Sequence, residues 1–192
     1  MNLPNKLTLI RIAMIPAFAA VYLIGAIPFN FVISAAIFAL AAFTDFLDGY
    51  IARKHKLVTN LGKFLDPIAD KVLVSTALVL MLVAPFGVGE TAVMPTYCAI
   101  SVVIILAREL IVSGFRIVAA SKGLVLAADK SGKLKTVFQD VAIVILLVGA
   151  DVMPGNYSVI GIIGLVVLAI ATLLTLTSGI EYLVKNREVL KG

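Results

Sequence analysis

The amino-acid sequence predicts an all-α, polytopic membrane protein, and three observations support that fold class. The chain has 192 residues, 61% of them hydrophobic. Long uncharged runs occupy residues 12–44, 72–89, 91–107, 141–150 and 152–180. Since about 20 apolar residues cross a bilayer as a helix, these runs provide several spans. Every other segment is too short for a separate soluble domain, so residues 1–192 are predicted to form one transmembrane domain.

We predict six transmembrane helices, because Gly25, Pro28 and Asn30 divide the first uncharged run into two. The helices are expected near residues 6–25, 29–52, 64–84, 93–120, 133–150 and 157–184. In the last of these, Gly161-x2-Gly164 and Ser178-Gly179 place small residues where another helix can approach closely.

Positive charge is confined to one side of this arrangement. The connections around 26–28, 85–92 and 151–156 contain no Lys or Arg. All 16 Lys and Arg residues lie at the termini, in the 53–63 and 116–133 connections, or at adjoining helix ends. The positive-inside rule therefore predicts that both termini are cytosolic. This distribution also accounts for the net charge of +5 without a nucleic-acid partner.

Four carboxylates lie within 26 residues, at Asp45, Asp48, Asp66 and Asp70. The spacings i, i+3 and i, i+4 place each pair on one face of a helix. A carboxylate at the centre of a bilayer costs about 2.5–3.5 kcal/mol, so the group indicates a functional site. Mg²⁺ or Mn²⁺ is the expected partner, because hard cations prefer oxygen ligands. The alternative is that these are helix-end charges, with Asp66 as an N-cap and Pro67 in a first turn.

The carboxylates are predicted to lie at the cytosolic edge of the membrane. Only 16 uncharged residues, 29–44, precede Asp45 in the second helix. At about 1.5 Å per residue this length falls short of the hydrocarbon core. Polar residues at 108–109 and 133–140 are expected at a similar depth. Because polar groups at that depth face the bundle interior or water, we predict a polar cavity that opens to the cytosol.

Residues 45–70 contain the pattern D-x2-D-G-x2-A-R-x8-G-x3-D-x3-D. This pattern resembles the signature of the CDP-alcohol phosphotransferase family at all eight fixed positions, and the six-helix layout is similar as well. Members of that family transfer a phosphoryl-linked group from a cytidine diphosphate donor to an alcohol and release CMP. The resemblance implies that Asp45, Asp48, Asp66 and Asp70 bind two divalent ions, and that Asp70 also acts as the general base.

The same resemblance implies a site for the cytidine nucleotide. Small residues let the nucleotide approach the backbone, and an arginine can neutralise phosphate. The start N-x2-T-x2-R, at Asn5, Thr8 and Arg11, is similar to the bacterial lipid branch of the family. The predicted nucleotide-binding residues are Asn5, Thr8, Gly49, Ala52, Arg53 and Gly62. Alternatively, Arg53 only sets topology, Asn5 caps a helix and Arg11 extends to the interface.

A second motif concerns the acceptor alcohol. The run S-G-K-x-K-T-x2-Q from Ser131, with A-R-E-L at 107–110, resembles the phosphatidylglycerophosphate synthase branch, whose acceptor is sn-glycerol 3-phosphate. A helix N-terminus capped by Ser131 and flanked by lysines suits a phosphate. The predicted acceptor-phosphate-binding residues are Arg108, Arg116, Lys133, Lys135, Thr136 and Gln139. Alternatively, Lys133 and Lys135 are topology-setting charges.

The predicted function is phosphatidyl transfer from CDP-diacylglycerol to sn-glycerol 3-phosphate at a bacterial cell membrane. The family resemblance implies a homodimer among membrane lipids. The nearest rival is a sister enzyme that makes cardiolipin, phosphatidylinositol phosphate or phosphatidylserine. A secondary transporter and a non-catalytic lipid-binding protein are further alternatives. Against a transporter, the sequence has no obvious inverted repeat, and its charges stop at one membrane level.

Overall fold

The computed structural model describes the backbone of residues 3–55, 60–83, 93–124, 126, 130–152 and 159–190. Side chains outside the description are those of residues 3, 4, 46, 48–55, 60, 61, 63, 64, 93–95, 130, 131 and 190. The described elements are α1 Leu3–Leu23, α2 Asn30–His55, α3 Asn60–Val83, α4 Val93–Ser121, α5 Lys130–Val152, α6 Val159–Lys185 and the 3-10 helix η1 Arg187–Leu190. The prediction of an all-α fold with six long helices is confirmed within these ranges.

Three described segments are long and apolar enough to cross a membrane, namely Asn5–Leu23, Thr96–Ser121 and Val159–Lys185. The segment Asn30–Asp45 of α2 is apolar but shorter. These lengths and compositions support a membrane protein. That all six helices cross the bilayer remains a prediction.

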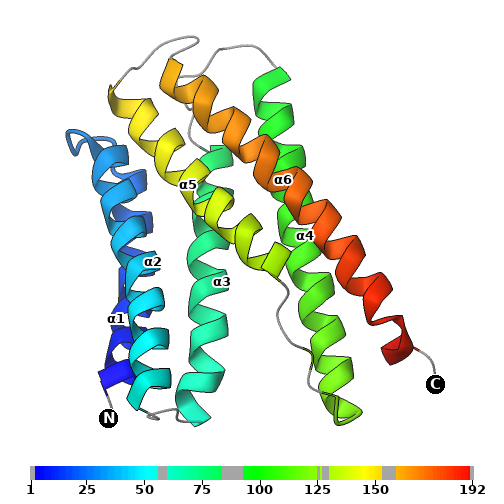
Figure 1. Ribbon diagram of the computed structural model, residues 1–192. Coiled ribbons are helices and arrows are strands. Elements are labelled where there is room, and N and C mark those ends of the chain that lie inside the picture. Colours follow the sequence, from blue (N-terminus) through cyan, green and yellow to red (C-terminus); the bar gives the residue numbers. More distant parts are fainter. Residues whose placement is uncertain are drawn as a thin grey trace.

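The helices form one bundle in which α5 lies between two groups (Figure 1). Helices α1, α2 and α3 contact one another, and α4 contacts α6. Helix α5 contacts both α2 and α6, and α3 contacts α4, so both contacts connect the two groups. The N-terminus and the C-terminus lie at the same end of the bundle, and the C-terminal ends of α1, α3 and α5 lie at the other. This is the arrangement of helix ends that the predicted sidedness requires.

Helix α6 packs closely on α5 because small residues line the contact. A Cβ added at Gly164 would lie 2.7 Å from the side chain of Leu146, closer than real Cβ contacts. Gly161 and Ala171 are also buried along α6. The small-residue pattern in the sequence therefore corresponds to a close helix contact, as in many membrane bundles.

The ends of α1, α2 and α5 away from the termini are joined by polar contacts. The backbone N–H of Val32, in the first turn of α2, donates to Asp151 Oδ2 of α5 at 2.7 Å. Asn30 Nδ2 donates to the carbonyl of Tyr22 in α1 at 2.9 Å. First-turn N–H groups have no partner within their own helix, so Asp151 provides the acceptor that α2 lacks.

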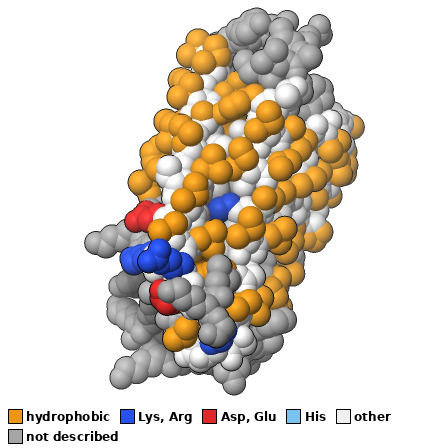
Figure 2. All heavy atoms as spheres, turned by 90° about the vertical axis from the view of Figure 1, so that its right-hand side faces the viewer, with side chains coloured by type: hydrophobic (Ala, Val, Ile, Leu, Met, Phe, Trp, Pro, Cys, Tyr) orange, Lys and Arg blue, Asp and Glu red, His pale blue; other side chains and the backbone are white. Residues whose placement is uncertain are grey.

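The exterior of the bundle is apolar. Leu110, Ile117 and Val83 are among the large hydrophobic side chains most exposed in the described part. Figure 2 shows hydrophobic side chains over most of one face, with the charged side chains in the lower half of that view. Several polar side chains are buried instead, including Arg11 and Lys135. An apolar surface around buried charges suits a lipid environment, in which polar groups face the bundle interior.

Two helix starts correct expectations from the sequence. Helix α3 begins at Asn60, four residues before the predicted start at 64, so Asp66 and Pro67 lie inside it. The alternative in which Asp66 caps this helix is therefore wrong. Proline favours a first turn because its missing N–H has no helical partner there. Here one lost hydrogen bond does not end the helix. Helix α5 begins at Lys130, three residues before the predicted start at 133. Ser131 therefore lies inside the helix, and the prediction that it caps α5 is wrong.

Candidate active site

Two predicted metal-binding carboxylates are held by residues of α1. Thr8 Oγ1 donates to Asp66 Oδ1 of α3 at 2.7 Å. Arg11, one helical turn further along, forms an ion pair through Nη1 with Asp45 Oδ1 of α2. The side chain of Arg11 is fully buried, so this positive charge belongs to the interior of the bundle. Helix α1 therefore fixes one carboxylate of α2 and one of α3.

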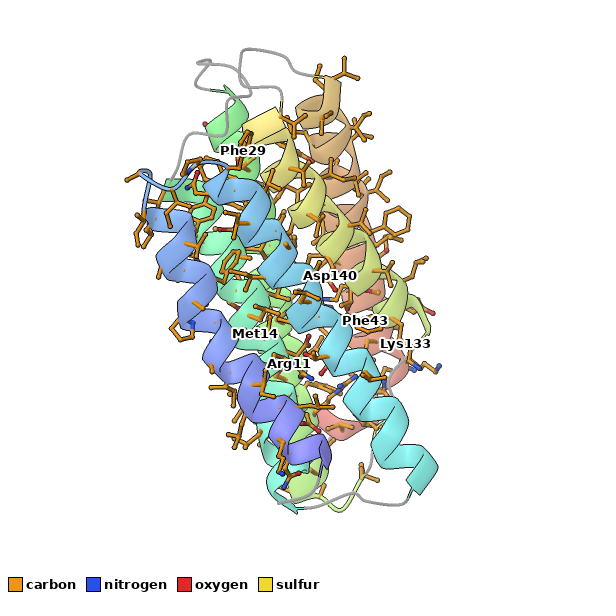
Figure 3. All side chains as sticks on the ribbon, turned by 90° about the vertical axis from the view of Figure 1, so that its left-hand side faces the viewer. Arg11, Met14, Phe29, Phe43, Lys133 and Asp140 are labelled. Atoms are coloured by element: carbon orange, nitrogen blue, oxygen red, sulfur yellow. The ribbon has the colours of Figure 1, made fainter. Side chains whose placement is uncertain are left out.

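Asp70 of α3 links these carboxylates to charged residues of α4 and α5. Its charge interacts with those of Asp45, Arg11, Glu109 and Lys135. Asp140 of α5 interacts in turn with Asp70 and Asp45. Asp140 Oδ1 is buried and has no hydrogen-bond partner among the described residues. Figure 3 shows Arg11 on α1 and Asp140 on α5, both directed toward the middle of the bundle. Asp45, Asp70 and Asp140, from three helices, therefore interact electrostatically with one another.

A pocket between α3, α4 and α5 begins at Asp70. Its described lining comprises Asp70, Lys71, Val74, Ser75, Ile105, Leu106, Glu109, Lys135, Thr136 and Gln139. Lys135 and Gln139 are almost completely buried. Gln139 Oε1 has no hydrogen-bond partner in the described part of the chain, so it is available to a bound molecule. Charged and amide side chains from α3, α4 and α5 therefore meet in this lining, beside the apolar side chains of Val74, Ile105 and Leu106.

Glu109 joins two cations at the edge of this pocket. Its Oε1 accepts from Arg108 Nη1 at 3.1 Å and also pairs with Lys135 Nζ. The main-chain carbonyl of Glu109 accepts from Ser113 Oγ, to which Lys71 of α3 donates. The sequence predicts that Glu109 lies at the depth of the cavity but gives it no role, because its partner Lys135 lies 26 positions away in the chain.

The other predicted acceptor residues lie at different distances from the pocket. Thr136 is part of the lining, and its Oγ1 donates to the Gly132 carbonyl at 3.2 Å. Lys133 is exposed on the outer side of α5 (Figure 3). Arg116 contacts Tyr182 of α6, with Nε 3.1 Å from the hydroxyl and the guanidinium 5.3 Å from the ring centroid. The structure therefore brings Lys135, Thr136 and Gln139 together and places Arg108, Lys133 and Arg116 outside this lining. Of these three, Arg108 contacts a lining residue, Glu109.

The predicted nucleotide residues are described only in part. Asn5, Thr8 and Gly62 are buried near the bundle end that holds the carboxylates. Asp48, Gly49, Ala52 and Arg53 belong to α2, but their side chains and surroundings lie outside the described residues. Arg11, which the sequence left open between a site residue and an interfacial one, is buried against Asp45.

The donor set suits a hard cation, although the described side chains form no complete metal site. Among them, no group of three or more His, Cys, Asp or Glu residues has metal-binding geometry. Asp45, Asp66 and Asp70 nevertheless supply oxygen donors of the type that Mg²⁺ prefers. The unpartnered Asp140 Oδ1 adds buried negative charge beside them. These residues fit a divalent cation as counter-charge.

The family model described as CDP-alcohol phosphatidyltransferase matches residues 1–177, which carry both the carboxylates and the pocket. The chain belongs to the CDP-alcohol phosphatidyltransferase family. It is 41% identical to the CDP-diacylglycerol–glycerol-3-phosphate 3-phosphatidyltransferase of Bacillus subtilis, over 99% of this chain and 97% of that protein. The Rickettsia bellii protein of the same name is 40% identical, over 94% of this chain and 93% of that protein. A CDP-alcohol phosphatidyltransferase relative from Arabidopsis thaliana, with the same activity in its name, is 38% identical over 79% of this chain and 52% of that protein.

Proposed function

We propose that this protein transfers the phosphatidyl group of CDP-diacylglycerol to sn-glycerol 3-phosphate, giving phosphatidylglycerophosphate and CMP. Membership of the CDP-alcohol phosphatidyltransferase family and the names of the full-length relatives support this activity. One structural observation carries the proposal. Asp70 both interacts with Asp45 of the carboxylate group and lines the pocket that holds Lys135 and Gln139. One residue therefore borders a site for a diphosphate and a site for a polar acceptor.

The carboxylates Asp45, Asp48, Asp66 and Asp70 would hold one or two divalent cations, Mg²⁺ or Mn²⁺. When bound, such ions neutralise the donor diphosphate and the departing CMP and make the acceptor hydroxyl more acidic. The chain itself orients the carboxylates, since Thr8 donates to Asp66 and Arg11 pairs with Asp45. Carboxylates held by other side chains keep their geometry, as hydrogen-bonded metal ligands do in other proteins.

Asp70 is the general base of the proposed reaction. A hydroxyl oxygen of glycerol phosphate attacks the β-phosphorus, which bears the diacylglycerol, and its proton passes to the Asp70 carboxylate. The bond between that phosphorus and the oxygen bridging to CMP breaks, and CMP leaves. The reaction is a direct displacement, so it requires no covalent enzyme intermediate. Asp70 is suited to this role because it borders the pocket in which the acceptor would lie.

The pocket would bind the phosphate of the acceptor. Lys135 supplies a buried ammonium from the lining. Arg108, outside the lining and linked to Lys135 through Glu109, would add a guanidinium, and the first turn of α5 would add N–H groups. Thr136 adds a hydroxyl and Gln139 an amide, which would form hydrogen bonds with the other oxygen atoms of the acceptor alcohol. Lys133 and Arg116 would contribute charge from outside this lining, which attracts an anionic acceptor at longer range.

The cytidine nucleotide would lie against the N-terminal part of α1 and the α2–α3 end of the bundle. Asn5, Thr8 and Gly62 are buried at that end. Gly49, Ala52 and Arg53 complete the proposed set through the family motif. The diacylglycerol tails of the donor would remain in the surrounding lipid, beside the apolar exterior of the helices.

The proposal also includes the placement of the protein. Six helices cross a bacterial cell membrane, both termini and the cavity face the cytosol, and two copies form a homodimer. The apolar spans and the bacterial relatives support a membrane location. The Lys- and Arg-rich connections support the orientation.

The test is CMP release by detergent-purified protein with CDP-diacylglycerol and a panel of acceptors. We expect release with sn-glycerol 3-phosphate, loss of release with a chelator, and recovery when Mg²⁺ or Mn²⁺ is added back. Release only with phosphatidylglycerol, inositol phosphate or serine would instead identify a sister enzyme. Absence of release with every acceptor would contradict the proposal and favour a transporter or a lipid-binding protein.

A further inference from the structure

Arg108 crosses the surface of α6 at the two small residues Ser178 and Gly179. Its Nη2 donates to Ser178 Oγ at 3.3 Å. A Cβ added at Gly179 would lie 2.9 Å from Arg108 Cγ, 3.4 Å from Nε and 3.7 Å from Cδ. The length of the arginine side chain therefore lies directly over the backbone of α6, in space that exists because residue 179 is glycine.

The position of the clash shows that Arg108 can keep its present conformation only if residue 179 is glycine. The atom nearest to the added Cβ is Cγ, close to the α4 backbone, and not the mobile end of the side chain. Arg108 could not avoid a methyl group by turning only its guanidinium. It would have to change rotamer near its base, which would move the guanidinium away from its present place.

The surroundings of the Arg108 guanidinium suit the binding of an anion. Nη1 meets Glu109, which also pairs with the buried Lys135 at the pocket edge. Nη2 lies 3.8 Å from the position of a Cβ on Gly132, in the first turn of α5. Arg108 Nε is buried and has no hydrogen-bond partner within the described residues. Arg108 therefore lies beside the N-terminus of α5 and is linked through Glu109 to a second cation, Lys135. Cations beside a helix N-terminus are a donor arrangement that phosphate groups prefer.

We propose that Ser178 and Gly179 of α6 form a cradle that positions Arg108 for the phosphate of the acceptor. They are positioning residues, because they act through Arg108 and not by contact with the substrate. This inference rests on the proposed function, whose acceptor carries the phosphate. It gives α6 a part in acceptor specificity, although none of its residues lines the described pocket.

The first experiment compares Gly179→Ala with wild type in both turnover and binding. We expect the KM for sn-glycerol 3-phosphate to rise about tenfold, while kcat and the KM for CDP-diacylglycerol change less than about twofold. Calorimetric titration of glycerol 3-phosphate should show the same loss of affinity. Gly114→Ala is the matched control, because nothing lies within 4 Å of a Cβ added there on α4. Ser178→Ala, which removes one hydrogen bond, should raise the KM about threefold.

A double-mutant cycle separates positioning from general packing. In an Arg108→Ala background the Cγ is gone, so Gly179→Ala should cause no further loss of acceptor affinity and should melt at the temperature of Arg108→Ala alone. The cradle is wrong if Gly179→Ala and Ser178→Ala bind the acceptor like wild type. It is equally wrong if Gly179→Ala lowers affinity as much without Arg108 as with it. If the wild-type protein binds glycerol 3-phosphate but does not transfer the phosphatidyl group, only the proposed function is overturned. If it neither binds glycerol 3-phosphate nor catalyses transfer, the proposed function and the cradle are both overturned.

Discussion

Asp70 is the residue at which the two parts of the site meet, so its replacement tests the proposed chemistry most directly. Asp70→Asn keeps the size of the side chain but removes its capacity to take a proton. We expect kcat for CMP release to fall about 10²- to 10⁴-fold, the usual contribution of a general base. Asp151→Asn, at the other end of the bundle, is the control and should keep wild-type kcat. A fall of less than about tenfold at Asp70 would remove it from the role of base.

Lys135 and Lys133 differ in burial although they are two residues apart on one helix. Lys135 is 4% exposed and pairs with Glu109, whereas Lys133 is exposed. We expect Lys135→Gln to raise the KM for sn-glycerol 3-phosphate about tenfold or more, since it removes a desolvated positive charge. Lys133→Gln should raise it less, because water and salt screen that charge. An equal or larger effect at Lys133 would contradict this assignment of the acceptor site.

At the scale of single residues, sequence reasoning identified types and spacings but not long-range partners. The spacing of Thr8 and Arg11 correctly indicated one face of α1, yet only the fold shows that this face meets Asp66 and Asp45. The role of Glu109 could not be predicted, because it depends on Lys135 from another helix. Local periodicity describes one helix at a time and does not determine which faces of different helices meet.

At the scale of helices, the sequence predicted the number of helices and their approximate positions well. It predicted the residues at which they begin less well. Long apolar runs give a strong signal for a helix, so all six were found. The predicted start of α3 at residue 64 is four residues late, and the alternative with Asp66 as N-cap would place it later still. The helix continues through Asp66 and Pro67, and only the structure could show this.

The contact between Asp151 and α2 makes a prediction about stability. Asp151→Ala removes the acceptor of the Val32 N–H. Loss of such a capping interaction costs about 1 kcal/mol. We therefore expect a lower unfolding temperature in detergent with unchanged kcat, because the residue lies at the end of the bundle away from the site. Asp151→Asn keeps an acceptor oxygen, so its unfolding temperature should lie between those of wild type and Asp151→Ala. If Asp151→Ala melts like wild type, this contact does not stabilise α2.

At the scale of the whole molecule, the bundle separates an apolar exterior from a polar interior at one end. Exposed hydrophobic side chains such as Leu110 face outward, while Arg11 and Lys135 are buried. A lipid-linked donor and a water-soluble acceptor require such a division, because one reactant stays in the bilayer and the other comes from water. Thr8 and Arg11 lie in the first half of α1, so the carboxylates that they contact lie in the half of the bundle nearer the two termini (Figure 1).

The orientation of this end in the membrane can be tested with single cysteines. Cys98, the one native cysteine, would first be replaced by serine. Lys122→Cys and Ala26→Cys then place exposed thiols at opposite ends of the bundle. Because Lys and Arg collect at the end of Lys122, the positive-inside rule predicts that an impermeant maleimide labels Lys122→Cys only in inverted vesicles and Ala26→Cys only in intact spheroplasts. The reverse pattern would place the acceptor pocket outside the cell, away from cytosolic glycerol phosphate and CDP-linked donors, and would rule out the proposed orientation.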